Sequence, residues 1–181
     1  MKMPGKNVIA LWLIWSAGMG LTGCGKPEPA VPPPEEIAAL EAEHYFAFTL
    51  GEAAFEAQLA VQPEEMRRGL MHRRRMDWNR GMFFIYTQPQ QMSFWMRNTY
   101  IPLDVGFFKP DGVLHEIYPM YPHVEDSVKS KSENIQFALE MNQGWFAQNG
   151  IRPGLKLNME ELKKALRDRG FSLQKFHLDE K

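Results

Sequence analysis

The sequence LDVGFFKPDGVLHEIY, residues 103–118, contains two short β-like segments separated by four residues with strong turn preferences. In the turn, Pro110 fits the second position of a type I turn and Gly112 fits the fourth. A turn of this type reverses the chain, so segments 103–108 and 113–118 are expected to pair as an antiparallel hairpin.

Other segments on both sides have the composition of strands. Large apolar residues alternate with smaller or polar ones at 46–50 and again at 55–61, and Gly51 between them can adopt the positive φ that a tight hairpin turn requires. Four more strands are expected on similar grounds, at residues 82–86, 91–97, 135–141 and 155–157. The sequence therefore predicts a domain made mainly of short strands.

Helical segments are expected at three places. Pro63 fits the first position of a helix, with acidic residues following it and basic residues before Gly69, as the helix dipole favours. A single helical turn is expected at 142–148. Near the C-terminus, Asn158 can cap a helix in which Glu161 occupies the third position, and apolar residues on one face would let this accessory helix dock on the domain.

The N-terminus has the organisation of a signal peptide. Two lysines precede an uncharged, largely apolar run from Val8 to Leu21, which is shorter than the roughly 20 residues that a membrane-spanning helix needs. The run ends in LTGC at residues 21–24, which resembles the lipobox of bacterial lipoproteins. This resemblance implies that residues 1–23 are a lipoprotein signal peptide and that the sulfur of Cys24 carries lipid. The alternative is a plain secretory signal with a chance cysteine.

The mature chain is expected to be anchored in a bacterial envelope. Gly25 follows the cysteine, and by resemblance to Gram-negative lipoproteins this favours the outer membrane, facing the periplasm. Residues 24–44 contain five prolines and are expected to form an extended tether. Removing residues 1–23 takes away two lysines and no acids, which leaves 19 basic and 22 acidic residues and a charge near −3. A chain with this balance of charges lacks the overall positive charge that is typical of nucleic-acid-binding proteins.

Several short motifs resemble, in their order and spacing, the bacterial exported and lipid-anchored proteins of domain-of-unknown-function family 192. The motifs are Gly69-Leu70-Met71, Gly81-Met82-Phe83-Phe84, Phe94 to Thr99, Pro102-Leu103-Asp104 and Ala138 to Met141, followed by Gly144, Gly150-Ile151 and Gly154. The resemblance implies an α+β fold, mainly antiparallel β, with a small, partly closed barrel-like domain at 45–157 that contains one or two short helices. Residues 158–181 would add the C-terminal accessory helix and tail. His72 departs from the family pattern, and the resemblance implies no particular activity.

The binding site is expected within residues 94–104. Its members are Trp95, Arg97, Asn98, Thr99 and Asp104. If this segment begins as a strand, Trp95 and Arg97 share one face and the polar residues lie at its end, where loops present them to ligands. A stacking surface, a bidentate donor and an amide suit a sugar ring or a carboxylate-bearing ligand. Alternatively, the polar side chains bond the turn backbone or an arginine, and Trp95 fills the core.

A basic stretch overlaps this segment. Seven arginines and only one acid, Asp77, occur between residues 67 and 97. Arg73, Arg74 and Arg75 are its densest part, and on a tethered protein they could contact anionic lipid head groups or acidic cell-wall glycans. The alternative is a solvated face balanced by acidic residues elsewhere.

Catalytic chemistry has less support. Asp104 and Glu140 could act as paired acid and base in a cell-wall hydrolase or modifying enzyme, which requires a separation of about 5 to 9 Å. The sequence contains no nucleophile motif or phosphate loop, and its scattered histidines predict neither a metal site nor a cofactor. Methionines near the family motifs could bind Cu(I) together with His72, or they could pack the core.

We therefore expect a non-catalytic envelope lipoprotein that binds a ligand or partner through residues 95–104 and the nearby arginines. Its partners would be the membrane, through the lipid anchor, and a cell-wall glycan or an envelope protein. A hydrolase that uses Asp104 and Glu140, and copper handling by methionines, are the alternatives.

Overall fold

The computed structural model describes residues 43–179. The expected signal peptide, the lipidation site Cys24 and nearly all of the expected tether lie outside the described residues. Within 43–179, no helix is both long and apolar enough to cross a membrane.

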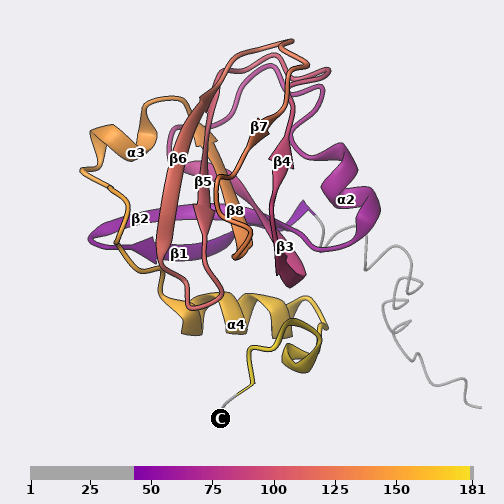
Figure 1. Cartoon of the computed structure of the whole chain (residues 1–181), viewed down its shortest axis with the longest axis vertical. Helices are drawn as coiled ribbons and strands as arrows, with labels where there is room; N and C mark the ends of the chain where they lie inside the picture. The colour runs from indigo at the N-terminus through magenta and orange to yellow at the C-terminus, as the bar shows by residue number, and fades with distance from the viewer. Residues whose placement is uncertain (1–42, 180–181) are drawn as a thin grey trace, which may run out of the picture. The chain divides into compact units, whose positions relative to one another are not determined.

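The main sheet has six strands in the order β1-β2-β3-β8-β5-β6 (Figure 1). Their bounds are β1 Phe46–Leu50, β2 Ala53–Ala60, β3 Arg80–Gln90, β5 Leu103–Phe108, β6 Leu114–Met120 and β8 Ile135–Asn142. All neighbours are antiparallel except β2 and β3, which run parallel. The expected α+β fold, mainly antiparallel β, is confirmed.

Both hairpins expected from the sequence are present. The amide of Gly112 donates to the carbonyl of Lys109 at 2.9 Å and closes the turn between β5 and β6. Gly51, with a φ of 62°, turns the chain between β1 and β2. Glycine suits this position because it has no Cβ to resist a positive φ.

The sheet is open and is not closed into a barrel. Within the described residues, β1 and β6 do not pair with each other. Leu157 instead forms an isolated bridge with Leu50 at the end of β1, and Lys156 forms one with Val113 beside β6. The strand expected at 155–157 is therefore reduced to two bridges that connect the edges of an open sheet.

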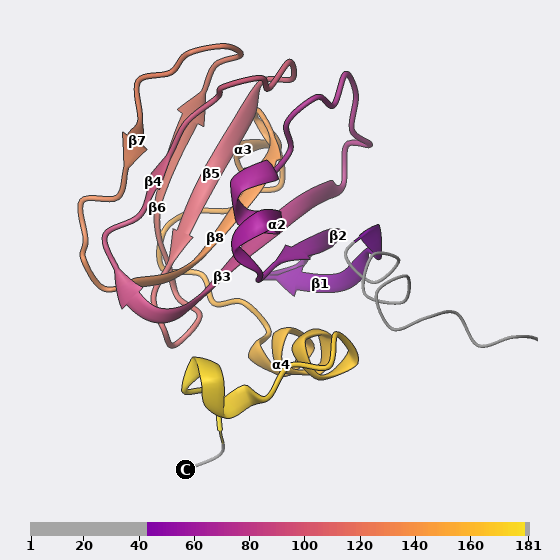
Figure 2. The same ribbon diagram turned by 90° about the vertical axis from the view of Figure 1, so that its right-hand side faces the viewer.

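Helices lie around the margins of the sheet (Figures 1 and 2). They are α2 Pro63–Arg68, α3 Trp145–Gln148 and α4 Met159–Asp168, followed by a 3-10 helix, η1, at Leu173–Phe176. Asn158 caps α4 as expected. Glu161 has a different role, because it accepts hydrogen bonds from the Thr49 backbone amide at 2.6 Å and from the Thr49 hydroxyl. Thr49 lies on an edge strand whose outward amide needs an acceptor, so Glu161 fastens α4 to β1.

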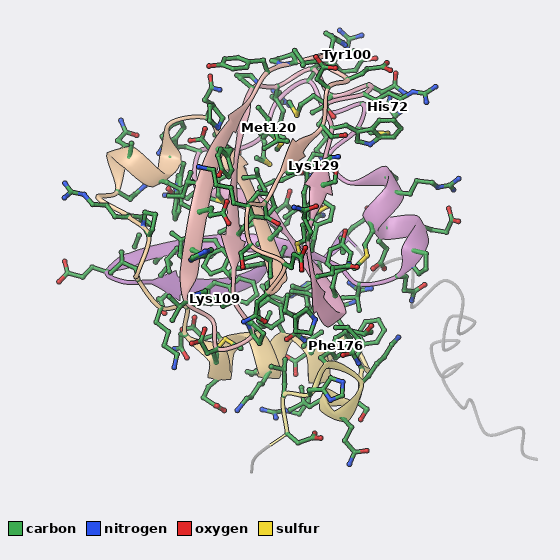
Figure 3. The ribbon with its side chains drawn as sticks, viewed as in Figure 1. His72, Tyr100, Lys109, Met120, Lys129 and Phe176 are labelled. Atoms are coloured by element: carbon green, nitrogen blue, oxygen red, sulfur yellow. The ribbon has the colours of Figure 1, made fainter. Side chains whose placement is uncertain are left out.

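Apolar side chains cover both faces of the sheet. Phe83 and Phe84 are successive residues of β3, so they project from opposite faces. Phe83 belongs to a core that includes Leu162 of α4 and Phe176 of η1, on the side where Figure 3 shows Phe176. Phe84 belongs to a second core that packs against the segment 92–101. The candidate site lies over this second core.

Candidate binding groove

The chain after β3 departs from its expected form. Between β3 and β5, the strand pairing in the described structure is that of β4, Ser93–Phe94, with β7, Val128–Lys129. Only residues 93 and 94 of the strand expected at 91–97 form a strand, so the rest of that prediction is wrong. The amide of Thr99 donates to the carbonyl of Met96 at 3.1 Å, and Asn98 has a φ of 55°, so the chain turns instead of extending. Asparagine tolerates this left-handed conformation better than most residues do.

Trp95 and Arg97 nevertheless share one side of this segment. Phe94 and Met96 are buried, whereas Trp95 is 44% exposed and Arg97 is also exposed. The guanidinium of Arg97 lies 5.5 Å from the centre of the Trp95 ring. Contact of this kind uses the flat face of the guanidinium and leaves its N–H edge available to a ligand.

Loops from three parts of the chain meet beside Trp95. The amide of His72, which has a φ of 65°, donates to the carbonyl of Asn98 at 2.8 Å. The ring centre of Tyr100 lies 6.4 Å from that of His72 and 5.2 Å from that of His123. Figure 3 shows His72 and Tyr100 together at the end of the sheet that is far from Lys109.

A groove of about 660 Å³ lies between α2 and the Trp95 segment. Its lining residues are Glu64, Glu65, Arg67, Arg68, Met71, His72, Trp95, Arg97 and Asn98. The sequence identified Trp95, Arg97 and Asn98 as site residues but missed the wall supplied by α2. No signal in the sequence places α2 beside this distant segment.

The groove contains both signs of charge, but its two acids are paired and two of its arginines are not. Glu64 is ion-paired within α2. Glu65 pairs with Arg169 at 2.6 Å and accepts from backbone amides at the start of α2. Arg68 and Arg97 form no ion pair with an acid among the described residues. Two guanidinium groups are therefore available to an anionic ligand.

The Arg73 to Arg75 triplet does not form one binding patch. Arg73 donates to the hydroxyl of Tyr45 at 2.8 Å and to the side chain of Gln58, so internal contacts occupy its guanidinium. Arg74 stacks on an aromatic ring, and Arg75 is exposed. None of the three lines the groove.

Thr99 and Asp104 bond to the backbone. Thr99 is 4% exposed, and its hydroxyl donates to the carbonyl of Arg97 at 3.3 Å. Asp104 is 8% exposed and accepts from the amide of Gly144 at 2.8 Å, just before α3. Burial raises the pKa of Asp104, and this hydrogen bond opposes the rise. Both contacts stabilise local turns. This agrees with the alternative in which the polar side chains of this segment bond the turn backbone.

Asp104 and Glu140 do not meet. In the β5–β8 ladder Asp104 lies opposite Met141, and Glu140 lies opposite Val105. Since successive side chains of a strand alternate, the two carboxyls project from opposite faces of the sheet. Met141 belongs to the core beneath α4, and Val105 belongs to the second core. The structure therefore does not assemble the paired acid and base that a glycosidase needs.

Glu140 projects from the face that carries the groove. It is 5% exposed, and burial raises its pKa to about 8, with the positive charge of Arg73 acting in the opposite direction. A carboxyl with this pKa is mostly protonated and neutral at pH 7. Glu140 lines a recess of about 30 Å³ together with Thr99 and Trp95.

Most methionines of the copper hypothesis are buried in the cores. Those buried in the two cores are Met82, Met92, Met96, Met120 and Met141. Met71 alone among the six lines the groove, where it adjoins His72. In the described range 43–179, no group of three or more His, Cys, Asp or Glu side chains could hold a metal ion. Five of the six methionines are therefore core residues, as the packing alternative expects.

Comparisons with known proteins agree with this fold. Residues 46–159 match the family model DUF192, described as Uncharacterized ACR, COG1430, which confirms the resemblance. A crystal structure from Sinorhizobium meliloti 1021, of a protein provisionally named a transcription regulator, is 32% identical, has a TM-score of 0.59, and aligns over 63% of this chain and 91% of its own. A protein of unknown function from Novosphingobium aromaticivorans DSM 12444 is 30% identical, has a TM-score of 0.61, and aligns over 78% and 99%. No curated protein matches the chain.

Proposed function

Since the chain belongs to the DUF192 family, which is described only as uncharacterised, we propose from the groove itself that the protein binds a carboxylate-bearing saccharide without transforming it. One observation carries this proposal. An exposed tryptophan face lies in the same groove as two guanidinium groups that no acid of the described chain neutralises.

The tryptophan ring and the guanidinium groups would each bind a different part of the ligand. The exposed ring of Trp95 presents an apolar face that can pack against the C–H face of a sugar ring. The guanidinium groups of Arg68 and Arg97 present paired N–H donors, which match the geometry of a carboxylate. Ligand sites typically have volumes of about 300–1,000 Å³, so the groove can hold a ligand of one or two rings.

The placement of the carboxyls favours recognition over hydrolysis. Hydrolysis by the common glycosidase mechanism requires two carboxyls about 5 to 9 Å apart across the bond that breaks. Asp104 and Glu140 project from opposite faces of the sheet, so Glu140 faces the groove side without Asp104. The groove therefore supports a binding module better than a cell-wall hydrolase.

Binding at the bacterial envelope is part of the proposal. Its support is the apolar N-terminal run that ends in LTGC, which would leave lipid on Cys24. The proline-rich residues 24–44 would then act as a tether that lets the groove reach a cell-wall glycan from the outer membrane.

The anchor is tested by Cys24→Ser. This variant is expected to leave the membrane fraction, and its N-terminal peptide is expected to lack the mass of a lipid group. A wild-type chain with an unmodified sulfur would refute the anchor.

Ligand binding is tested with the full-length chain purified in detergent and an oligogalacturonide as the probe. The methyl-esterified oligogalacturonide is the matched probe, because it keeps the rings and loses the charges. Calorimetry is expected to show binding of the acid at least about tenfold tighter than binding of the ester, since a hydrogen bond to a charged group contributes about 1.5–3 kcal/mol.

Variants of the groove arginines test which groups bind the carboxylate. Arg68→Ala and Arg97→Ala are each expected to weaken binding of the acid about tenfold and to leave binding of the ester unchanged. Arg152→Ala is the control, because Arg152 is exposed and lines neither the groove nor the recess beside Glu140. Equal losses in all three variants would refute the proposal. Binding to anionic phospholipid vesicles but not to the acid would also refute it.

A further inference from the structure

The recess of about 30 Å³ adjoins the groove. The residues that line both spaces are Arg67, Arg68, Met71 and Trp95. Thr99 and Glu140 line the recess but not the groove, and so do Met66, Gly69, Leu70, Phe84 and Phe94. The recess therefore offers a ligand in the groove a buried hydroxyl and a buried carboxyl.

Glu140 differs from other buried carboxyls of the described chain. Asp104 accepts from the amide of Gly144, and Glu116 accepts from the hydroxyl of Tyr118 and from two backbone amides. The carboxyl of Glu140 has no hydrogen-bond or ion-pair partner within 43–179, although the residue is only 5% exposed. Within the described residues, the fully buried side-chain atoms without a partner are Nε2 of Gln143 and Nε of Arg169, so the oxygens of Glu140 remain accessible from the recess that they line.

The surrounding strands hold this carboxyl in place. Glu140 lies in the sheet between Met82 of β3 and Val105 of β5, which are both buried. Gly81 packs so closely that a Cβ on it would overlap the carbonyl oxygen of Glu140. The β3 and β8 backbones are therefore in close contact at this point. Arg73, whose charge acts on Glu140, already donates to two other side chains.

We propose that the recess is a subsite that receives one hydroxyl group of the saccharide, with Glu140 and Thr99 as its hydrogen-bonding partners. This inference rests on the proposed function of the groove. A space of about 30 Å³ accommodates a group of the size of one water molecule. A hydroxyl both donates and accepts hydrogen bonds, so it can satisfy the carboxyl and the threonine together.

Other small groups fit the recess less well. An ammonium group would lie beside Arg67 and Arg68, and a methyl group would leave Glu140 without a partner. Burial, which raises the pKa of Glu140 to about 8, keeps the carboxyl neutral, so it does not repel a ligand carboxylate held by the arginines. The hydroxyl of Thr99 already donates to the carbonyl of Arg97, so it meets the ligand as an acceptor.

The subsite is tested with the full-length chain in detergent and two probes, D-galacturonate and cyclohexanecarboxylate. Both probes have a six-membered ring and a carboxylate, but the second has no hydroxyl groups. The wild type is expected to bind galacturonate about tenfold more tightly, as one additional buried hydrogen bond predicts.

Variants at nearly constant volume identify the partners of the hydroxyl. Thr99→Val and Glu140→Leu are expected to reduce the preference for galacturonate to about twofold or less, without changing the affinity for cyclohexanecarboxylate. Glu140→Gln keeps a donor and an acceptor, so it is expected to retain most of the preference. Arg152→Ala is expected to behave as the wild type.

The possible outcomes separate this inference from the proposed function. A preference that survives both Thr99→Val and Glu140→Leu overturns the subsite. Equal binding of the two probes to the wild type overturns it too, and leaves the groove proposal standing. If neither probe binds the wild type, the proposed function itself fails. Should Glu140→Leu not fold, as thermal unfolding would show, Thr99→Val still decides the result.

Discussion

Replacing Glu140 with glutamine tests whether its carboxyl is buried and neutral in the folded protein. Burial raises the pKa of Glu140 to about 8 from the ordinary value of 4.5. Between these two pH values the folded protein holds this proton more tightly than the unfolded chain does. The stabilising contribution is therefore fully present below about pH 4.5, decreases as the pH rises, and is lost above about pH 8.

The size of the effect follows from the two pKa values. Each pH unit between them changes the free energy of unfolding by about 1.4 kcal/mol, so the interval from 4.5 to about 8 corresponds to an upper limit of about 5 kcal/mol. Domains typically have a total stability of only about 5–15 kcal/mol, so the change should be measurable. Glutamine has a similar shape and does not titrate. The Glu140→Gln variant should therefore lose this part of the pH dependence.

Urea unfolding, followed by tryptophan fluorescence at pH 5, 7 and 9, measures the effect. The two proteins are expected to have similar stability at pH 5, and the variant is expected to be more stable by several kcal/mol at pH 9. Asp104, whose pKa burial also raises, is present in both proteins, so its titration cancels in the difference. If the stabilities of the two proteins change in parallel from pH 5 to pH 9, the carboxyl is hydrated or paired and the reasoning is refuted.

Three further changes test the strand packing, the docking of α4 and the groove. Gly81→Ala would drive a Cβ into the carbonyl oxygen of Glu140, so urea unfolding is expected to show a loss of about 1–3 kcal/mol; an unchanged value would mean that β3 and β8 can separate. Glu161→Ala removes the acceptor of the Thr49 amide and is expected to cost about 1–3 kcal/mol, and an unchanged melting temperature would contradict this role. Trp95→Ala should leave the melting temperature unchanged and abolish oligogalacturonide binding in calorimetry; retained binding would rule out stacking on this ring.

Individual elements of the fold could be predicted because their signals are local. The hairpin at 103–118, the helix that begins at Pro63 and the cap at Asn158 each depend on residues close together in the chain, and the structure confirms all three. The prediction of a strand at 91–97 failed for an equally local reason. The left-handed conformation of Asn98 turns the chain there, in spite of the alternating pattern that precedes it.

The groove could be predicted only in part, because its walls are far apart in the sequence. Trp95 and Arg97 were identifiable from their side-chain chemistry, but the contribution of Arg68 depends on how α2 packs beside them. The sequence also does not show which residues of β5 and β8 lie opposite each other. A register shifted by one residue would have placed Asp104 and Glu140 on the same face, so the paired-carboxyl hypothesis could be tested only in the structure.

The free positive charge of the groove depends on the C-terminal helix. Arg169, which is 6% exposed and follows α4, pairs with Glu65 of α2 at 2.6 Å and donates to the backbone carbonyl of Leu59 at 3.0 Å. Glu65 also accepts from backbone amides at the start of α2, so a single carboxylate caps this helix and neutralises Arg169. Because Glu65 is paired in this way, it does not neutralise Arg68 or Arg97. The helix that completes the opposite core thereby keeps the arginines of the groove available to an anionic ligand.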